Sequence, residues 1–240
     1  MNKIGIFGLG AIGAVMTKYL YKNLDNDLYF FSRSDKHQLT IESNNEKTII
    51  PISLRRNIDF ELDWLLVCLK EFHYAKATSD LSLLINEKTK VAIFRNGIDL
   101  KAPFLSFVKP EKLLETIIDC PTQEISSQEY KQIRDAKISL PIKSLSKTFS
   151  QLFIGDSLSF QFVKDFEKAQ WTKLIESSSL VPIQVVARQP CVIVKSKKYR
   201  GVYHRLILEG IKVAQGFGVD IYDSLVDQLM LILTIKEAPC

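Results

Sequence analysis

Hydrophobic and polar positions follow two different rhythms along the chain. Its first part alternates short apolar runs, typical of β-strands, with segments in which apolar residues recur at helical spacing. The run at 64–69 is continuously apolar, as in a parallel strand buried on both faces. An alternation of strands and helices predicts an α/β domain built on a parallel sheet. The predicted strands lie at 4–7, 28–31, 64–69 and 91–94, with helices near 14–20 and 74–85.

The rhythm changes in the last third. From about residue 162 apolar residues recur at helical spacing, and residues 207–217 and 225–235 predict two amphipathic helices. Gly216 and Gly218 are placed to end the first of these. In between, alternation at 137–142 and around Cys120-Pro121 predicts strands about a loop, and we assign no chemistry to 110–160.

A glycine-rich segment follows the first predicted strand and opens the first predicted helix. Gly8 permits a tight turn, Gly10 allows close approach to a pyrophosphate, and Gly13 lets the helix lie near the strand. The free N–H groups at the helix amino terminus attract phosphate. This context predicts a Rossmann-type dinucleotide-binding domain, with the phosphates held by Gly8, Leu9, Gly10, Ala11, Ile12 and Gly13.

The residues at the end of the second predicted strand distinguish domains that bind NAD from domains that bind NADP. NAD-binding proteins usually carry Asp or Glu there to bond the ribose 2′-hydroxyl. This chain has Arg33 between two serines, with Lys36 close behind. An arginine pairs with a 2′-phosphate through charge-assisted hydrogen bonds, so we predict NADP(H) rather than NAD(H). Asp35 is the one acid nearby and is equally consistent with a turn residue.

Two further residues stand where parallel sheets bind ligands. Lys70 follows the strand at 64–69 and Asn96 follows the strand at 91–94, so both fall at the carboxyl edge of the sheet. Lys70 is equally consistent with a solvated lysine, and Asn96-Gly97 with a simple turn. As site residues, both would bind the cofactor and the substrate.

Composition narrows the class of protein. The 240 residues are 46% hydrophobic and 25% charged, which excludes collagen-like and disordered chains. No apolar run approaches the length that spans a bilayer, and the start lacks a signal-peptide pattern, so we expect a cytoplasmic protein. The four cysteines and three histidines are scattered, so we predict no metal site.

The charge balance says little about partners. Lys and Arg exceed Asp and Glu by five (32 against 27), too small an excess to argue for nucleic acid. The basic cluster Lys195, Lys197, Lys198 and Arg200 is typical of a solvated face, although it could also bind a phosphate or an acidic partner.

Taken together, these motifs resemble the ketopantoate reductase (2-dehydropantoate 2-reductase) family. Its pattern joins the glycine motif to Val-x-Val-Lys, Gln-Asn-Gly and a helix with Lys and two Asn, the second before Pro. The resemblance covers most of 1–100 and 167–235 and thins at 110–160. The matching segments here are Gly8–Gly13, Val67-Cys68-Leu69-Lys70, Arg95-Asn96-Gly97 and Trp171-Thr172-Lys173-Leu174 with Pro182.

The resemblance implies a Rossmann domain at 1–162 and a smaller all-helical domain for substrate binding or dimerisation at 163–240. It implies that NADPH reduces a 2-keto acid, nominally ketopantoate, on the route to pantothenate and coenzyme A. Lys173 would be the general acid that protonates the ketone oxygen. Lys70 and Asn96 would position cofactor and keto acid, with Ser177 as a further hydroxyl for the substrate.

The chain also departs from the family pattern. Ser177 and Val181 stand where the family has Asn, and Val181 cannot hydrogen-bond. The family usually continues for several tens of residues beyond Cys240, including a Ser and a Glu for the substrate, so we expect either a truncated chain or a short relative with an altered or missing substrate pocket. Apolar surface exposed in such a helical domain would favour a homodimer. The alternative function is a non-catalytic NADP(H)-binding paralogue or sensor, to which the glycines and Arg33 are equally suited.

Overall fold

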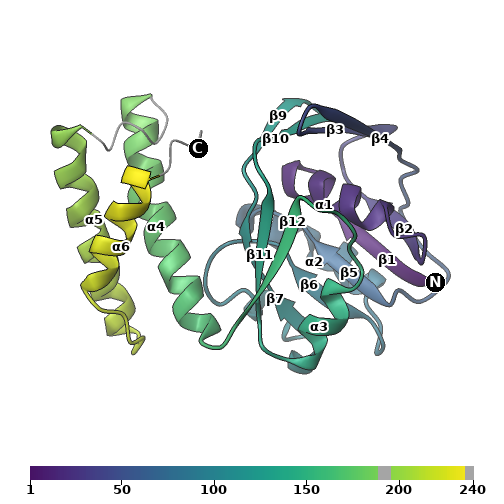
Figure 1. Ribbon diagram of the computed structural model, residues 1–240. Helices are drawn as coiled ribbons and strands as arrows, with labels where there is room; N and C mark the ends of the chain where they lie inside the picture. Colours follow the sequence, from purple (N-terminus) through teal and green to yellow (C-terminus); the bar gives the residue numbers. More distant parts are fainter. Residues whose placement is uncertain (189–195, 236–240) are drawn as a thin grey trace. The chain divides into compact units, whose positions relative to one another are not determined.

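The structure is a computed structural model that describes residues 1–188 and 196–235 (Figure 1). The chain forms two compact units. The first comprises Met1–Arg95 and Asp99–Lys164, and the second comprises Asn96–Ile98 and the chain from Asp165 onward. The first is an α/β unit of Rossmann type and the second is helical, which confirms the predicted fold class.

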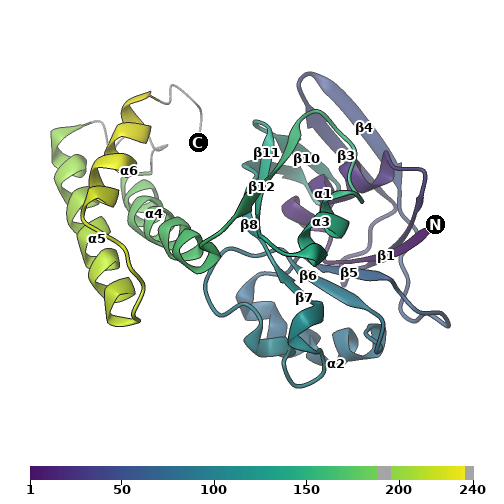
Figure 2. The same ribbon diagram turned by 60° about the horizontal axis from the view of Figure 1, so that its bottom comes forward.

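A five-stranded parallel sheet forms the centre of the first unit. Its order is β2-β1-β5-β6-β7 (Figure 2). The chain passes from β1 to β2 on one side and then returns to β5 on the other, so the strand order reverses between β1 and β5. Open α/β sheets bind ligands beyond the carboxyl ends of the strands at such a reversal. The strands are β1 (Asn2–Phe7), β2 (Asn26–Phe31), β5 (Trp64–Val67), β6 (Lys90–Ile93) and β7 (Leu113–Glu115).

Helices and short turns connect these strands. Helix α1 (Ala11–Tyr21) links β1 to β2, and η1 (Glu71–His73) with α2 (Tyr74–Leu84) links β5 to β6. Every α1 residue from Gly13 to Leu20 is buried. A helix buried over its whole length must be covered on more than one side. Two further 3-10 turns, η2 (Ala102–Phe104) and η3 (Pro110–Lys112), precede β7.

The cover over α1 comes from a second sheet of four strands in the order β4-β3-β10-β9. Figure 1 shows α1 between this sheet and β1. Ile41 of β3 and Tyr130 of β10 share one hydrophobic core with Met16 of α1 and Ile6 of β1. The strands are β3 (Gln38–Ser43), β4 (Glu46–Pro51), β9 (Thr122–Ser126) and β10 (Glu129–Gln132).

Polar contacts also bind α1 to the second sheet. Lys18 is 3% exposed, and its ammonium donates to Ser43 Oγ at 2.6 Å and to Gln132 Oε1 at 3.3 Å. The Tyr19 hydroxyl is 2.9 Å from the same Gln132 oxygen and donates to the Ser157 carbonyl at 2.8 Å. Burial lowers the pKa of Lys18. Hydrogen bonds therefore replace the water that these polar groups lose on folding.

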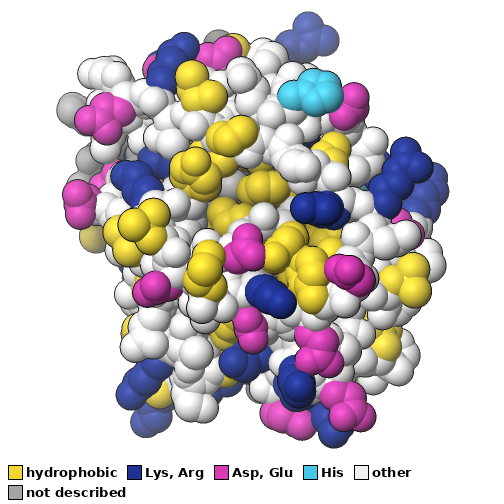
Figure 3. Space-filling view, turned by 90° about the vertical axis from the view of Figure 1, so that its right-hand side faces the viewer, with side chains coloured by type: hydrophobic (Ala, Val, Ile, Leu, Met, Phe, Trp, Pro, Cys, Tyr) yellow, Lys and Arg dark blue, Asp and Glu magenta, His cyan; other side chains and the backbone are white. Residues whose placement is uncertain are grey.

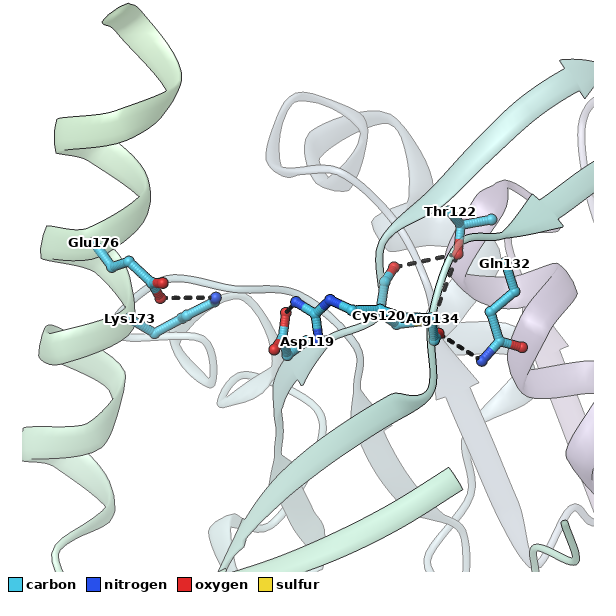
Figure 4. A network of polar contacts seen from close by, with 7 residues as sticks. All are labelled: Asp119, Cys120, Thr122, Gln132, Arg134, Lys173 and Glu176. Atoms are coloured by element: carbon cyan, nitrogen blue, oxygen red, sulfur yellow. Dashed lines mark hydrogen bonds and ion pairs between the residues drawn. The ribbon is translucent and has the colours of Figure 1, made fainter. Parts of the chain in front are cut away.

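A third sheet, ordered β12-β11-β8, completes the unit. Its strands are β8 (Ile117–Asp119), β11 (Ala136–Pro141) and β12 (Leu158–Val163), and α3 (Ser144–Ser150) lies between the last two in sequence. Arg134 Nη2 donates to Asp119 Oδ1 at 2.8 Å, and the Arg134 carbonyl accepts from Gln132 Nε2 at 3.1 Å (Figure 4). Through Arg134, the third sheet is connected to β10 of the second.

The helical unit consists of α4 (Phe166–Ala187), α5 (Lys197–Gly216) and α6 (Ser224–Ile235). Tyr203, Ile207, Ile211 and Ala214 form the buried stripe of α5, which packs with Trp171 and Ile175 of α4 and Leu225 of α6. Asp165 caps α4 by accepting from the Lys168 backbone N–H at 3.1 Å. A helix stripe that faces a core in this way is the pattern that helical spacing predicts.

Two sequence-based boundaries are wrong. Helical structure starts at Phe166 rather than near 162, because residues up to Val163 pair with β11 as strand β12. Helix α5 begins at Lys197, ten residues before the predicted start at 207, because its polar first turns lack an apolar signal. Gly216 does end it.

The surface carries both signs of charge. On the face shown in Figure 3, Lys and Arg side chains alternate with Asp and Glu around a hollow with apolar side chains, so neither sign dominates there. Among the described helices, none is long and apolar enough to cross a membrane.

Replacement of Gly13 by alanine should strongly destabilise the protein. An added Cβ would lie 2.0 Å from the Gly8 carbonyl oxygen, a backbone atom that cannot move without displacing the turn. We expect a loss of about 3 kcal/mol in the free energy of unfolding, measured by urea titration.

Gly201→Ala is the matched control, since Gly201 lies inside α5 with no atom within 4 Å of the added Cβ. This variant should gain roughly 0.5–1 kcal/mol from the helix preference for alanine. Equal stabilities of the two variants would contradict the close approach at Gly13.

Candidate functional site

The turn after β1 is held tightly between two strands. The Gly8 N–H donates to the Phe31 carbonyl at 2.9 Å, and Gly8 has φ +97°. A Cβ at Gly8 would lie 2.8 Å from the Cys68 carbonyl oxygen at the end of β5. Only glycine suits this position, because the backbone conformation and the space both exclude a side chain. The turn therefore lies at the point where the strand order reverses.

Gly10, unlike Gly8, has open space around it. It is exposed, and no atom lies within 4 Å of the place that a Cβ would occupy. Helix α1 begins at the next residue, with no acidic side chain in its first turn and no side chain capping its N–H groups. Such an amino terminus presents free N–H donors and a partial positive charge to a phosphate. The geometry around Gly10 fits the pyrophosphate of a dinucleotide.

The other residues of the motif lie where the turn enters the helix. Leu9 is 1% exposed, and its carbonyl accepts a hydrogen bond from the Tyr130 hydroxyl at 3.0 Å. Ala11 and Ile12 are the first residues of α1 and are half-buried against the core. They contribute backbone N–H groups rather than side-chain chemistry.

Arg33 follows β2 and is exposed. Its Nη2 is 2.9 Å from Nδ1 of His73, which lies in the η1 turn after β5. Because the guanidinium has only donors, the contact requires an unprotonated Nδ1 on the imidazole. His73 therefore orients Arg33. No pattern in the sequence predicts this contact, since 40 positions separate the two residues and only the sheet, in which β2 and β5 lie on either side of β1, brings them together.

Lys36 does not lie with Arg33 at the surface. It is 5% exposed, and its ammonium donates to the Ser127 carbonyl and to the Tyr130 hydroxyl. Lys36, which follows Arg33 closely in sequence, therefore adds no second surface cation after β2, because its side chain turns inward beneath the second sheet. Arg33 itself remains exposed at the end of β2.

Lys70 lies at the carboxyl end of β5, as its position in sequence predicts. Its side chain is exposed, and it is the N-cap residue that directly precedes η1. Its carbonyl accepts from the His73 N–H at 3.0 Å, so the turn that presents Lys70 also sets the position of His73. This places one ammonium at the edge of the sheet on the side of the strand-order reversal.

The segment after β6 divides between the two units. Arg95 belongs to the first, where it pairs with Glu71 and its guanidinium carbon lies 4.8 Å from the centroid of the Tyr74 ring. Asn96 is exposed and belongs to the second, where Ile98 packs against the helical core. Arg95 therefore has a structural role in place of the glutamine of the related motif.

Lys173 lies on α4 in the helical unit, with its side chain 24% exposed. Its ammonium donates to Glu176 Oε2 at 2.9 Å, and Figure 4 shows the two groups directed at each other from successive turns. The two side chains therefore form an ion pair between half-buried groups one turn apart on α4. The Ser177 hydroxyl, predicted to meet the substrate, donates to the Lys173 carbonyl at 2.9 Å.

The described residues contain no group of three or more His, Cys, Asp and Glu side chains that could hold a metal ion. The Cys68 thiol at the end of β5 has a pKa raised by burial. A thiol in that state is a weak nucleophile. The polar groups at the edge of the sheet, Arg33, Lys70 and the amino terminus of α1, are hydrogen-bond donors suited to an anionic ligand.

Comparison with known proteins identifies the family to which these features correspond. Residues 4–142 match the profile of the family described as ketopantoate reductase PanE/ApbA. A 2-dehydropantoate 2-reductase of Caulobacter vibrioides is 26% identical over 234 residues, which cover 96% of this chain and 80% of the relative.

Solved structures share the fold. A dimeric ketopantoate reductase from Staphylococcus aureus superimposes with a TM-score of 0.82 at 19% identity, covering 98% of this chain and 81% of that one. A D-mandelate dehydrogenase with NADH and anilino(oxo)acetate gives a TM-score of 0.84 at 17% identity, covering 96% of this chain and 80% of that one. At these identities the likeness establishes the fold.

Replacement of Gly10 by alanine should weaken dinucleotide binding without destabilising the protein. The added Cβ meets no protein atom but occupies the open space beside the helix amino terminus. We expect the free energy of unfolding to change by less than about 1 kcal/mol, as for exchanges at helix N-cap positions.

NADPH affinity should fall by about tenfold or more, a loss comparable to that of one well-placed hydrogen bond. Fluorescence titration with NADPH and urea unfolding measure the two quantities. An unchanged affinity would show that the phosphates do not approach Gly10.

Proposed function

Because this chain belongs to the ketopantoate reductase PanE/ApbA family, we propose that it reduces a 2-keto acid with NADPH, nominally 2-dehydropantoate (ketopantoate) to pantoate. This step would serve the synthesis of pantothenate and coenzyme A. The observation that carries the proposal is the open amino terminus of α1 at Gly10, with Arg33 exposed at the end of the next strand. We place this activity in the cytoplasm.

The choice of NADPH over NADH rests on Arg33. An acid at the end of β2 would bond a ribose 2′-hydroxyl and repel a 2′-phosphate. The exposed guanidinium instead offers donors to that phosphate, and its contact with His73 Nδ1 restricts the side chain to one region. The bound nicotinamide supplies the hydride.

Lys173 is proposed as the general acid. Its ammonium donates a proton to the ketone oxygen as the hydride reaches the carbonyl carbon, and its charge stabilises the developing alkoxide. Glu176 accepts a hydrogen bond from this ammonium at 2.9 Å and so restricts where the proton donor lies. Lys173 regains a proton from solvent after each turnover because its side chain is partly exposed.

Other residues are assigned to binding. Lys70 and Asn96 bind cofactor and keto acid, a carboxylate being a natural partner for an ammonium and an amide. Ser177 is proposed to bond the substrate. The proposal assigns the cofactor to the domain at 1–162 and substrate binding and dimerisation to the helices at 163–240. The dimeric relative from Staphylococcus aureus supports a homodimer.

One observation favours a second function, binding of NADP(H) without turnover. Val181 is 49% exposed on α4, where the family carries an asparagine that can hydrogen-bond. The loss of one such donor from a site weakens binding by roughly 1–3 kcal/mol. A sensor or degenerate paralogue would retain the glycine turn and Arg33 while lacking turnover.

Lys173→Ala should abolish most of the turnover while leaving the cofactor site intact. We expect kcat for ketopantoate reduction to fall about 100-fold or more, the usual contribution of a general acid. NADPH affinity should be unchanged, because Lys173 is not among the residues assigned to the cofactor. NADPH oxidation and fluorescence titration measure these quantities.

Lys168→Ala is a matched control on the same helix. Within the part of the chain that the structure describes, the Lys168 ammonium lies 5.2 Å from the centroid of the Tyr222 ring and has no hydrogen bond or ion pair. Lys173→Arg separates two roles, because arginine retains the charge but does not release a proton near neutral pH. Full activity in Lys173→Ala would contradict the assignment of the general acid.

Arg33→Gln should remove the preference for NADPH over NADH. The neutral amide retains some hydrogen bonding but loses the charge-assisted contacts, so NADPH affinity should fall by about 10-fold or more. NADH affinity should change little, since that cofactor has no 2′-phosphate. Lys36→Gln, a change of the same type at a buried lysine, should not alter the ratio of the two affinities. A wild-type preference for NADH would contradict the assignment of Arg33.

A further inference from the structure

Three groups form a chain of hydrogen bonds beneath the glycine turn. The Lys36 ammonium donates to the Tyr130 hydroxyl at 3.1 Å, and that hydroxyl donates to the Leu9 carbonyl at 3.0 Å. Lys36, Tyr130 and Leu9 are 5%, 1% and 1% exposed. This series of hydrogen bonds therefore links the buried Lys36 ammonium to Leu9 in the middle of the Gly-x-Gly turn, and all three residues are shielded from water.

The donors and acceptors of these groups favour one arrangement of the hydrogen bonds. An ammonium has only donors, so Tyr130 must accept from Lys36 and has a single hydrogen left to donate. Two carbonyls lie within reach of that hydrogen, Leu9 at 3.0 Å and Ser127 at 3.2 Å. Lys36 already donates to the Ser127 carbonyl, which leaves Leu9 as the better acceptor for Tyr130. Burial raises the pKa of Tyr130 to about 12, so the hydroxyl retains its hydrogen at neutral pH.

The bond to Leu9 has a consequence for its neighbour. The Leu9 carbonyl and the Gly10 N–H belong to one planar trans peptide unit and point in opposite directions. With the carbonyl held toward Tyr130, the Gly10 N–H is directed away from the interior, to the open side of the turn. The free φ of Gly10 would otherwise allow this peptide to rotate easily.

We propose that Tyr130 and Lys36 are positioning residues that hold the Leu9–Gly10 peptide in the orientation that binds the dinucleotide pyrophosphate. The inference rests on the proposed function, because it assigns a role in binding the same cofactor. A binding group held in place before the ligand arrives loses less entropy on binding. The residues act through Leu9 and touch neither cofactor nor substrate themselves.

Tyr130→Phe tests the proposal by removing one oxygen while retaining the buried ring. We expect the dissociation constant for NADPH, measured by fluorescence titration, to rise by about tenfold. The kcat at saturating NADPH should stay close to that of the wild type. Lys36→Met should raise the dissociation constant by less, since Tyr130 can then divide its hydrogen between Leu9 and the vacated Ser127 carbonyl.

Two matched controls separate positioning from stability. Tyr19→Phe removes an equally buried hydroxyl bonded to Gln132 and Ser157, and Lys18→Met removes a buried ammonium bonded to Ser43 and Gln132. Neither contact reaches the glycine turn. These variants should lose comparable stability but retain wild-type NADPH affinity. The double variant Tyr130→Phe/Lys36→Met should have the same dissociation constant for NADPH as Tyr130→Phe, because both changes interrupt the same series of hydrogen bonds.

The outcomes distinguish this inference from the proposed function. If the wild type binds NADPH and Tyr130→Phe binds it equally well, or no more weakly than Tyr19→Phe, the positioning role is overturned and the proposed function stands. If the wild type binds neither NADPH nor NADH, the proposed function fails and the positioning role fails with it. Should Tyr130→Phe not fold, the comparison of Lys36→Met with Lys18→Met gives the same test.

Discussion

The amino terminus of α1 lies directly against the turn that leads into it, and this approach determines the surroundings of the candidate cofactor site. A side chain at Gly13 would collide with the Gly8 carbonyl, and a side chain at Gly8 would collide with the end of β5. Because Gly8 and Gly13 have no side chains, the helix terminus can lie at the place where the strand order reverses. A helix terminus at that place supplies a partial positive charge where an anionic ligand binds.

A second constraint follows from the burial of α1. The helix is covered by the second sheet, so two lysines become interior groups, Lys18 on the helix and Lys36 below the sheet. Buried ammonium groups are stable only where hydrogen-bond acceptors replace water. Carbonyl, hydroxyl and amide oxygens of the second sheet and its turns supply them. The sheet that closes the core therefore also fixes the turn through Tyr130.

The sequence predicted the parallel strands and the glycine turn well, because both depend on local spacing. The apolar run at 64–69 can be recognised from a few consecutive residues, and so can the motif from Gly8 to Gly13. The second sheet was not predicted, since it pairs β3 with β10, from a distant part of the chain. The burial of Lys36 depends on the same non-local pairing, and the contact of Arg33 with His73 depends on the pairing of β1 with both β2 and β5.

Helix boundaries show a related limit. The apolar stripe of α5 begins at Tyr203, so its polar first turn from Lys197 gave no periodic signal. The predicted basic cluster falls partly on this turn, and Lys195 lies outside the described residues. Asn96 follows β6, as its place in the sequence predicts, and its segment Asn96–Ile98 groups with the helical unit. Position along the chain does not determine which unit a connecting residue joins.

The most direct test of the account follows a labelled hydride. NADPH carrying two deuterium atoms at C4 of the nicotinamide would be incubated with the protein and ketopantoate, and the pantoate formed would be analysed by mass spectrometry. The account predicts pantoate with one deuterium at C2, formed faster with NADPH than with labelled NADH. Bound NADPH with no deuterated pantoate would contradict the reductase assignment and favour a protein that binds the cofactor without turnover.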